Sequence, residues 1–300
     1  MDTKRYLAFL KFNLFLILFT IVFLFSQSVL GADLDEIKKR GVLRHLGVPY
    51  ANFVTGSGDG LDVEMMKLFA QSLGVEYQYV KTSWKTVISD LIGHKIEIVD
   101  NDVNIKGKVP IRGDLIANGM TILPWRQKVL SFAAPNFPTQ VWLIARRDSS
   151  LSPITPANDI RQDIVSVKEL LRNRMVMGKS NTCLDPQLYN LKKNDIKYKY
   201  INGSLNELAP AIINGEAEST LLDVPDALIA LEKWSGKIKV IGPISEQQVM
   251  ACAFPKSSPK LRSAYSLFFE KRKKDGTYLR LVKKYYPGVF NYYADFFENL

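Results

Sequence analysis

Several groups that can bind a ligand lie close together in residues 119–126, GMTILPWR. A glycine such as Gly119 lets a ligand approach the backbone closely, because it has no side chain. Thr121 adds a hydroxyl and an amide, and Arg126 offers a planar guanidinium that pairs with a carboxylate through two hydrogen bonds. These residues predict a site for a carboxylate, unless Arg126 is an ordinary partner in a surface ion pair.

Two carboxylates, Asp223 and Asp226, lie three residues apart where a strand is expected to lead into a helix. Paired carboxylates can act as a general acid and a general base. Each also has a structural explanation, since Asp223 can cap the helix and Asp226 in its first turn suits the helix dipole. The residues alone leave both explanations open.

Common catalytic and cofactor motifs are absent from the sequence, which has no H-E-x-x-H, C-x-x-C, G-x-S-x-G or phosphate-loop pattern. Two histidines and two cysteines exclude a protein with several zinc sites. His45 and His94 fit structural positions better than catalytic ones. The glycine-rich stretch 56–60 has no lysine at the start of the helix that follows it, which favours a flexible turn. We therefore expect no metal and no cofactor.

The elements that must position these groups alternate between strands and helices. The 300 residues are 47% hydrophobic and 23% charged, which supports a buried core and excludes a disordered or fibrous chain. This alternation predicts an α/β fold of two lobes, each with a parallel sheet and crossover helices. The predicted strands are 42–48, 75–80, 114–117, 174–177, 197–201, 219–222 and 238–241, and the predicted helices are 61–73, 83–93, 186–192, 205–214, 225–234 and 261–286.

The first 31 residues are predicted to be a signal peptide. Three basic residues precede an apolar run from Leu14 to Phe25, which is shorter than the roughly 20 residues that span a bilayer. Cleavage is predicted after Gly31, and the alternative is an uncleaved N-terminal anchor. Export places the chain in the periplasm, which argues against nucleic acid as the partner for its formal charge of +10.

The sequence resembles a known family, the family 3 periplasmic solute-binding proteins of polar amino-acid ABC transporters. The resemblance covers almost all of the chain after the signal peptide, and GMTILPWRQKVLSFAAP is its most specific part. The matching segments are LDEIKKRGVLRHLGV (34–48), GLDVEMMKLFAQSLGVEYQYV (60–80), SWKTVISDLIGHKIE (83–97), DLIANGMTILPWRQKVLSFAAP (114–135), VMGKSNT (176–182), LDVPDAL (222–228) and KKDGTYLRLVKKYYP (273–287).

The resemblance implies a ligand that is held at both of its charged ends. Arg126 stands where the family's arginine grips the ligand α-carboxylate, and Asp223 where an acidic residue receives the α-ammonium. The other positions that match ligand-binding positions of the family are Gly119, Thr121, Trp84, Lys179, Thr182 and Tyr50, with Phe53 as an alternative to Tyr50.

The resemblance also implies two Rossmann-like lobes joined by a two-strand hinge, the type II periplasmic binding protein-like fold. The chain would cross between the lobes at 138–141 and return at 246–249. Lobe 1 would then comprise residues 32–139 and 249–300, and lobe 2 residues 140–248. An insertion near 97–113 would be an extra hairpin or an irregular loop.

Cys183 and Cys252 have two possible states. They form a disulfide, as an oxidising compartment allows, or they stay as free buried thiols. The predicted layout puts Cys183 on lobe 2 and Cys252 just past the hinge, so a bond between them would restrain opening.

We expect an extracytoplasmic, monomeric protein that captures a small amino-acid-like or carboxylate ligand between its lobes and delivers it to the permease of an ABC transporter. Two alternatives stay open. The chain could be a periplasmic enzyme of the cyclohexadienyl dehydratase type, in which an acidic residue protonates a leaving hydroxyl. It could also be a sensing module that presents its bound state to a membrane receptor.

Overall fold

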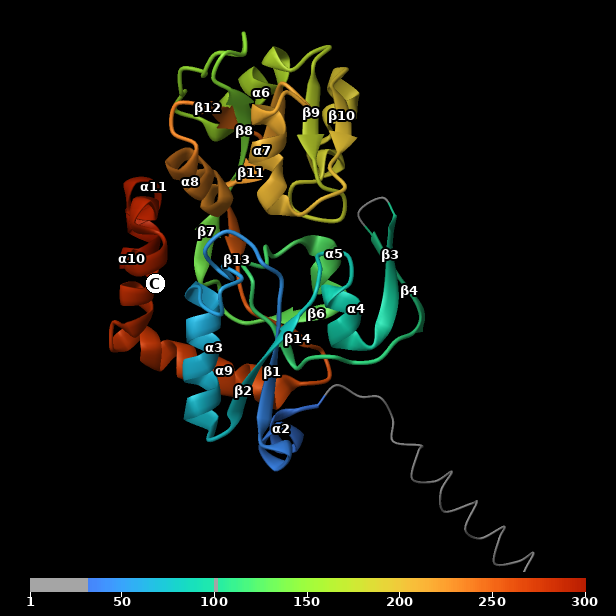
Figure 1. Ribbon diagram of the computed structural model, residues 1–300, viewed down its shortest axis with the longest axis vertical. Coiled ribbons are helices and arrows are strands. Elements are labelled where there is room, and N and C mark those ends of the chain that lie inside the picture. The colour runs from blue at the N-terminus through green and yellow to red at the C-terminus, as the bar shows by residue number, and fades with distance from the viewer. Residues whose placement is uncertain (1–31, 100–101) are drawn as a thin grey trace, which may run out of the picture. The chain divides into compact units, whose positions relative to one another are not determined.

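The computed structural model describes residues 32–99 and 102–300 (Figure 1). The predicted signal peptide and its cut after Gly31 lie outside the described residues. Within these ranges, no helix is both long enough and apolar enough to cross a membrane.

The first lobe contains a five-stranded sheet with the order β2-β1-β5-β14-β6. β1 pairs in parallel with β2 and β5, as the alternating pattern predicts, whereas β14 is antiparallel to β5 and β6. The strands are β1 (Val42–Gly47), β2 (Glu76–Lys81), β5 (Leu115–Ile116), β6 (Leu130–Phe132) and β14 (Ala253–Pro255), and the helices are α2 (Leu34–Arg40), α3 (Leu61–Leu73), α4 (Val87–Ile92) and α5 (Pro124–Gln127).

The second lobe contains another five-stranded sheet, with the order β10-β9-β11-β8-β12. β9 pairs in parallel with β10 and β11, and β8 is antiparallel to β11 and β12. The strands are β8 (Val141–Arg146), β9 (Met175–Gly178), β10 (Lys197–Tyr200), β11 (Ser219–Asp223) and β12 (Ile238–Pro243), and the α-helices are α6 (Ile160–Leu170), α7 (Leu208–Ile213) and α8 (Val224–Lys233).

The two lobes are connected by a small antiparallel sheet of two strands, β7 (Phe137–Thr139) and β13 (Gln248–Met250). Thr139 lies opposite Gln248, and Phe137 opposite Met250. The chain passes from the first lobe to the second through β7 and returns through β13 (Figure 1). This arrangement is the two-strand hinge of the predicted fold. The residue boundaries that the sequence sets for the lobes stay a prediction.

Two predicted helices differ from the structure. The helix expected at 83–93 begins only at Val87, because residues 84–86 form a turn and Thr86, with φ −119°, is the N-cap. The helix expected at 186–192 is replaced by two 3₁₀ helices, η1 (Pro186–Tyr189) and η2 (Leu191–Asn194), since the intervening Asn190 has a left-handed backbone with φ 55°. A third 3₁₀ helix, η3 (Leu205–Glu207), precedes α7.

The segment near 97–113, which the sequence suggests is an insertion, contains a hairpin. Its strands are β3 (His94–Val99) and β4 (Asp102–Lys108), which among the described residues pair only with each other, in an antiparallel sheet. Along β3 the side chains alternate between half-buried and exposed, as expected for a ribbon with one covered face. Of the two structures left open by the sequence, the hairpin is therefore the right one.

The C-terminal segment packs against both lobes. Helices α9 (Pro259–Lys274) and α10 (Thr277–Tyr285) are separated at the turn Asp275-Gly276, which interrupts the helix expected at 261–286, and η4 (Pro287–Val289) and α11 (Phe290–Glu298) follow. The ring of Phe297 lies 5.6 Å from that of Phe137 in the hinge, and the ring of Tyr292 lies 5.3 Å from that of Trp142 in the second lobe. The aromatic tail thus covers the hinge, as Figure 1 shows for α11.

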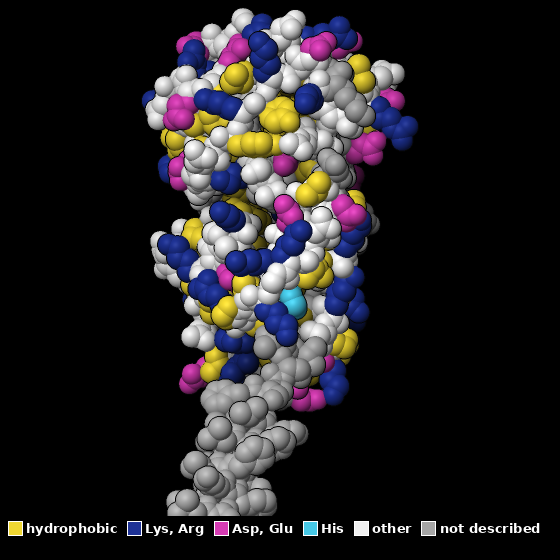
Figure 2. Space-filling view, turned by 90° about the vertical axis from the view of Figure 1, so that its right-hand side faces the viewer, with side chains coloured by type: hydrophobic (Ala, Val, Ile, Leu, Met, Phe, Trp, Pro, Cys, Tyr) yellow, Lys and Arg dark blue, Asp and Glu magenta, His cyan; other side chains and the backbone are white. Residues whose placement is uncertain are grey.

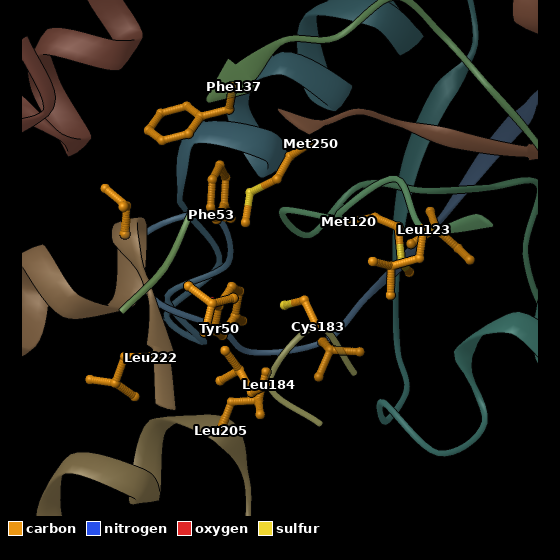
Figure 3. Packing of buried hydrophobic residues seen from close by; sticks show 14 of the residues in the cluster. Tyr50, Phe53, Met120, Leu123, Phe137, Cys183, Leu184, Leu205, Leu222 and Met250 are labelled. Carbon is orange, nitrogen blue, oxygen red and sulfur yellow. The ribbon is translucent and has the colours of Figure 1, made fainter. Parts of the chain in front are cut away.

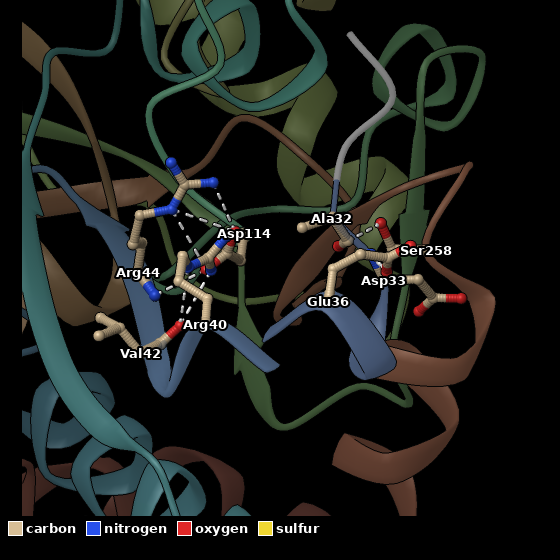
Figure 4. A network of polar contacts seen from close by, with 8 residues as sticks. All are labelled: Ala32, Asp33, Glu36, Arg40, Val42, Arg44, Asp114 and Ser258. Carbon is tan, nitrogen blue, oxygen red and sulfur yellow. Dashed lines mark hydrogen bonds and ion pairs between the residues drawn. The ribbon is translucent and has the colours of Figure 1, made fainter. Parts of the chain in front are cut away.

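A buried ion-pair cluster fixes the edge where β1 meets β5. Asp114, just before β5, is 1% exposed and pairs with Arg40 at 2.5 Å and with Arg44 at 2.8 Å (Figure 4). It also accepts a hydrogen bond from the Arg44 backbone amide at 2.8 Å. These contacts hold the start of the segment that carries residues 119–126.

A second buried carboxylate fixes the loop at Gly119, between Asp114 and Arg126. Asp62 in α3 is 3% exposed and accepts a hydrogen bond from the Gly119 amide at 2.8 Å. Burial raises the pKa of Asp62 to about 7, although the bond from Gly119 opposes the shift. Asp62 therefore holds its proton more tightly in the folded chain than in the unfolded chain.

Because the pKa of Asp62 is raised, the effect of Asp62→Asn on the free energy of unfolding should depend on pH. As the pH rises from 3.8 to about 7, the unfolded chain ionises Asp62 more readily than the folded chain, which lowers the free energy of unfolding of the natural protein. Asparagine keeps an acceptor for Gly119 but does not ionise. In urea unfolding, the stability of the variant relative to the natural protein should therefore increase through this window, by a few kcal/mol at most. Asp35→Asn is the control and should show no such rise, because a hydrogen bond with Lys260 lowers, and does not raise, the pKa of the exposed Asp35. A pH-independent difference for Asp62→Asn would contradict the argument.

Candidate functional site

The buried guanidinium of Arg126 is the central group of the site. Arg126 lies in α5, where Pro124 occupies the first turn, and is 1% exposed. Its Nη1 donates to the Thr121 carbonyl at 2.8 Å, while its Nε has no hydrogen-bond partner among the described residues. The guanidinium carbon lies 5.2 Å from the ring of Trp125 and 5.9 Å from that of Trp84. Aromatic faces and one carbonyl thus surround the cation.

Most of the electrostatic neighbours of Arg126 belong to the second lobe, and Tyr50 of the first lobe is another. Burial lowers the pKa of Arg126 to about 10, and interactions with Cys183, Tyr189 and Asp223 oppose that shift. At neutral pH the group stays charged. In the part of the chain that the structure describes, no carboxylate forms an ion pair with it. A buried cation without an anionic partner is costly, so the site favours an added anion.

Thr121 and Gly119 lie in the loop that precedes Arg126. Thr121 is 1% exposed, forms a bridge with Met250 of the hinge, and has a hydroxyl without a partner in the described structure. Gly119 has φ 65°, and a Cβ there would lie 2.5 Å from the ring of Phe53. Its amide is used by Asp62. The glycine is therefore required by the close approach of Phe53, and its amide is not free for a ligand.

Asp223 lies opposite, at the end of β11 in the second lobe. It is 1% exposed, caps α8 by accepting from the Asp226 amide at 3.3 Å, and also accepts from the hydroxyl of Tyr50 and from Cys183 Sγ at 3.6 Å. Burial raises the pKa of Asp223 to about 6, while the bond from Tyr50 opposes the shift. Burial and the charge of Asp223 raise the pKa of Asp226 well above its ordinary value. Asp223 thus both caps the helix and faces the first lobe.

Tyr50 joins the two lobes at this point. It follows β1, is 1% exposed, and donates its hydroxyl to Asp223. The Ala51 amide adds a second link by donating to Asn206 Oδ1 of the second lobe at 3.1 Å. The Tyr50 ring meets that of Trp84 edge to face at 5.5 Å. Figure 3 shows Tyr50 beside Cys183 and Leu184, with Phe53 nearer the hinge residue Phe137. Tyr50, not Phe53, is therefore the aromatic that reaches Asp223.

The loop of residues 179–184 in the second lobe uses its polar groups internally. Lys179 Nζ donates to the carbonyls of Ile201 at 3.0 Å and Gly203 at 2.8 Å. The Thr182 hydroxyl donates to the Lys179 carbonyl at 2.8 Å and accepts from the Leu184 amide at 3.1 Å. Both residues shape the loop, and Lys179 also lines a cavity of about 570 Å³ together with Trp84.

The structure contains no disulfide between Cys183 and Cys252, since both are free and buried. Of the two states that the sequence leaves open, the structure has the free buried thiols, and the two thiols have different neighbours. Cys183 faces Asp223 across 3.6 Å, and Cys252 Sγ lies 3.1 Å from the Tyr265 hydroxyl. Burial raises the pKa of Cys183 to about 12, so the thiol stays protonated and can donate to Asp223.

Three other residues at the site are not predicted from the sequence. Asn206 accepts a hydrogen bond from the Ala51 amide, and Cys183 contacts Asp223. Asn118 is fully buried, and its side-chain Oδ1 and Nδ2 have no hydrogen-bond partner in the described structure. Asn118 directly precedes Gly119, so its position beside the GMTILPWR segment is the only sequence signal for it. Cys183 directly follows Thr182, a predicted site residue, whereas nothing in the sequence indicates that Asn206 approaches the cleft.

Two five-stranded sheets joined by a two-stranded hinge define the periplasmic binding protein-like fold of type II. The chain belongs to the bacterial extracellular solute-binding proteins, family 3, whose family model matches residues 46–108 and 111–288. The resemblance noted in the sequence is thereby confirmed.

Two curated relatives match most of the chain. Membrane-bound lytic murein transglycosylase F of Desulfosudis oleivorans is 25% identical over 77% of the chain, which spans only 44% of that protein. An octopine-binding periplasmic protein of Rhizobium meliloti is 22% identical over 71% of each chain.

Solved structures share the fold at low identity. A mutant of ArgBP from T. maritima has a TM-score of 0.67 and 24% identity, covering 85% of this chain and 99% of that one. An ancestral amino acid-binding protein, described as a precursor of cyclohexadienyl dehydratase, has a TM-score of 0.64 and 23% identity, covering 84% and 98%.

The hydrogen bond from Tyr50 to Asp223 predicts how Tyr50→Phe changes the pKa of Asp223. The Tyr50 hydroxyl stabilises the ionised carboxylate, so its removal should raise the pKa of Asp223 above about 6. An NMR titration of the Asp223 side-chain carboxyl carbon measures this directly. Tyr278→Phe is the matched control, because its buried hydroxyl donates to the Asn136 carbonyl and does not contact Asp223. An unchanged pKa in Tyr50→Phe would show that the bond does not persist in solution.

Proposed function

We propose that the chain is an extracytoplasmic solute-binding protein that captures a small amino acid or carboxylate between its two lobes. The observation that carries the proposal is the buried guanidinium of Arg126, which has an unpaired Nε and no carboxylate partner among the described residues. A carboxylate ligand would supply both the missing charge and the missing acceptor. The facing carboxylate, Asp223, suits an ammonium group at the other end of the same ligand.

The remaining site residues have supporting roles in this proposal. Thr121 offers its unpaired hydroxyl to the ligand carboxylate, and Gly119 keeps the loop in place against Phe53. Trp84 and Tyr50 form aromatic walls, while Lys179 and Thr182 shape the loop of the second lobe. Because the two charged groups lie on different lobes, a ligand that binds both favours the closed arrangement.

We further propose that this protein acts in the periplasm, as a monomer, and passes its ligand to the permease of an ABC transporter. Membership of the family and the likeness to an octopine-binding periplasmic protein support this role. The proposed clamp needs no cofactor, since the two ends of the ligand are recognised by side-chain charges alone.

A thermal-shift screen of amino acids and small carboxylates tests the clamp. A ligand at a hundred times its Kd should stabilise the natural protein by about 2.7 kcal/mol. Arg126→Ala should lose this stabilisation, because the guanidinium that binds the ligand carboxylate is removed. Arg126→Met should lose it too, while better preserving the packing of the side-chain stem. Arg147→Ala is the control, since Arg147 is exposed and outside the site. A full shift in both Arg126 variants would refute the assignment.

One observation favours an enzyme as the second candidate. Burial raises the pKa of Asp223 to about 6, which suits a general acid near neutral pH. The ancestral relative described as a dehydratase precursor shares the fold. Turnover of prephenate or arogenate by the purified protein separates the candidates. We expect the natural protein to show no more turnover than the Asp223→Asn variant, because the proposed role of Asp223 is to bind an ammonium group. Turnover that depends on Asp223 would replace the first proposal by the second.

A further inference from the structure

Trp84 separates two cavities beside the proposed clamp. The first, of about 570 Å³, lies between the turn that carries Trp84 and the second-lobe residues Lys179 and Asn206. The second, of about 490 Å³, lies between Trp84, Trp125 and the hairpin of β3 and β4. Trp84 and Lys85 line both cavities. We call these two adjoining cavities the vestibule.

Positive charge dominates the lining of the vestibule. Its basic residues are Lys81, Lys85, Lys95, Lys106 and Lys179, and its single acidic residue, Glu97, is already paired with Lys106 at 3.0 Å. In the described ranges, no carboxylate pairs with Lys81, Lys85 or Lys95. Figure 2 shows Lys and Arg side chains beside the hollow between the lobes on this face, interspersed with a few acidic ones.

Two further features indicate that the vestibule receives polar groups of a ligand. Trp84 Nε1 is buried and has no hydrogen-bond partner in the described structure, although Trp84 lines both cavities. Lys179 is held in place by three carbonyl oxygens of residues 201–203, which fixes its positive charge at the wall of the larger cavity. The other wall residues of that cavity include Thr82 and Ser204, whose hydroxyls already donate to Asp90 and Glu207, so the lysines carry its polarity toward a ligand.

We infer that the vestibule selects ligands that carry an anionic group on a side chain extending past Trp84. This inference rests on the proposed function, in which Arg126 and Asp223 hold the α-carboxylate and α-ammonium. A negative group would meet several lysines, whereas a cationic side chain would meet like charges. The cavity of about 570 Å³ falls in the range that holds ligands larger than a simple amino acid, so acidic amino acids and their longer conjugates both fit its volume.

Binding of L-glutamate, L-glutamine and L-arginine to the full chain, measured by isothermal titration calorimetry at low salt, tests the inference. Glutamate and glutamine have nearly the same shape, so their difference reports the charge of the side chain. Glutamate should bind roughly tenfold more tightly than glutamine, and arginine should bind most weakly. In 1 M NaCl, where the screening length is about 3 Å, the preference for glutamate should largely disappear.

The double variant Lys81→Gln/Lys85→Gln should reduce the preference for glutamate over glutamine to about threefold or less, because two of the positive charges that line the vestibule are lost. Lys256→Gln is the matched control, because Lys256 is an exposed lysine that lines neither cavity. Equal binding of glutamate and glutamine, or a preference that survives in the double variant, overturns the inference. If none of the three binds, or if binding is unaffected by Arg126→Ala, the clamp itself fails and the inference fails with it.

Discussion

The structure of the site depends on one interaction that the chain leaves incomplete. The buried guanidinium of Arg126 contacts two tryptophan rings and one carbonyl, and in the described structure no carboxylate forms an ion pair with it, although the charge of Asp223 acts on it from the second lobe. A fully desolvated cation of this kind lowers the stability of the folded chain. Such an arrangement is understandable in a protein whose function is to bind an anion, because the bound anion recovers part of that stability.

Much of the first lobe serves to hold this cation in place. Asp114 fixes the beginning of the segment that leads to Arg126, and Asp62 holds the loop at Gly119 through a hydrogen bond to the backbone. The bridge between Thr121 and Met250 attaches the same loop to the hinge. The position of the guanidinium is thus coupled to the strands that connect the lobes, which links recognition of a ligand to the relative motion of the lobes.

The fold could be predicted from the sequence because helix and strand periodicity and the order of the family-like segments are local properties. The details of the site depend on distant contacts that no local pattern specifies. Tyr50 and Asp223 are 173 residues apart, and the sequence could not decide whether Tyr50 or Phe53 would reach the cleft. In the same way, the pairing of Gly119 with Asp62 and the bonds of Lys179 to residues 201–203 could not be foreseen.

The C-terminal helix α11 has a consequence for how the lobes separate. Tyr292 packs on Trp142 of the second lobe, whereas Phe297 packs on Phe137 in the hinge. Between them, Tyr293 already departs from helical geometry, with φ −138° and ψ 38°. Any rotation that widens the cleft must either part the Tyr292 and Trp142 rings or bend the helix at Tyr293. Packing of the tail on both the hinge and the second lobe therefore opposes separation of the lobes through residues that lie outside the cleft.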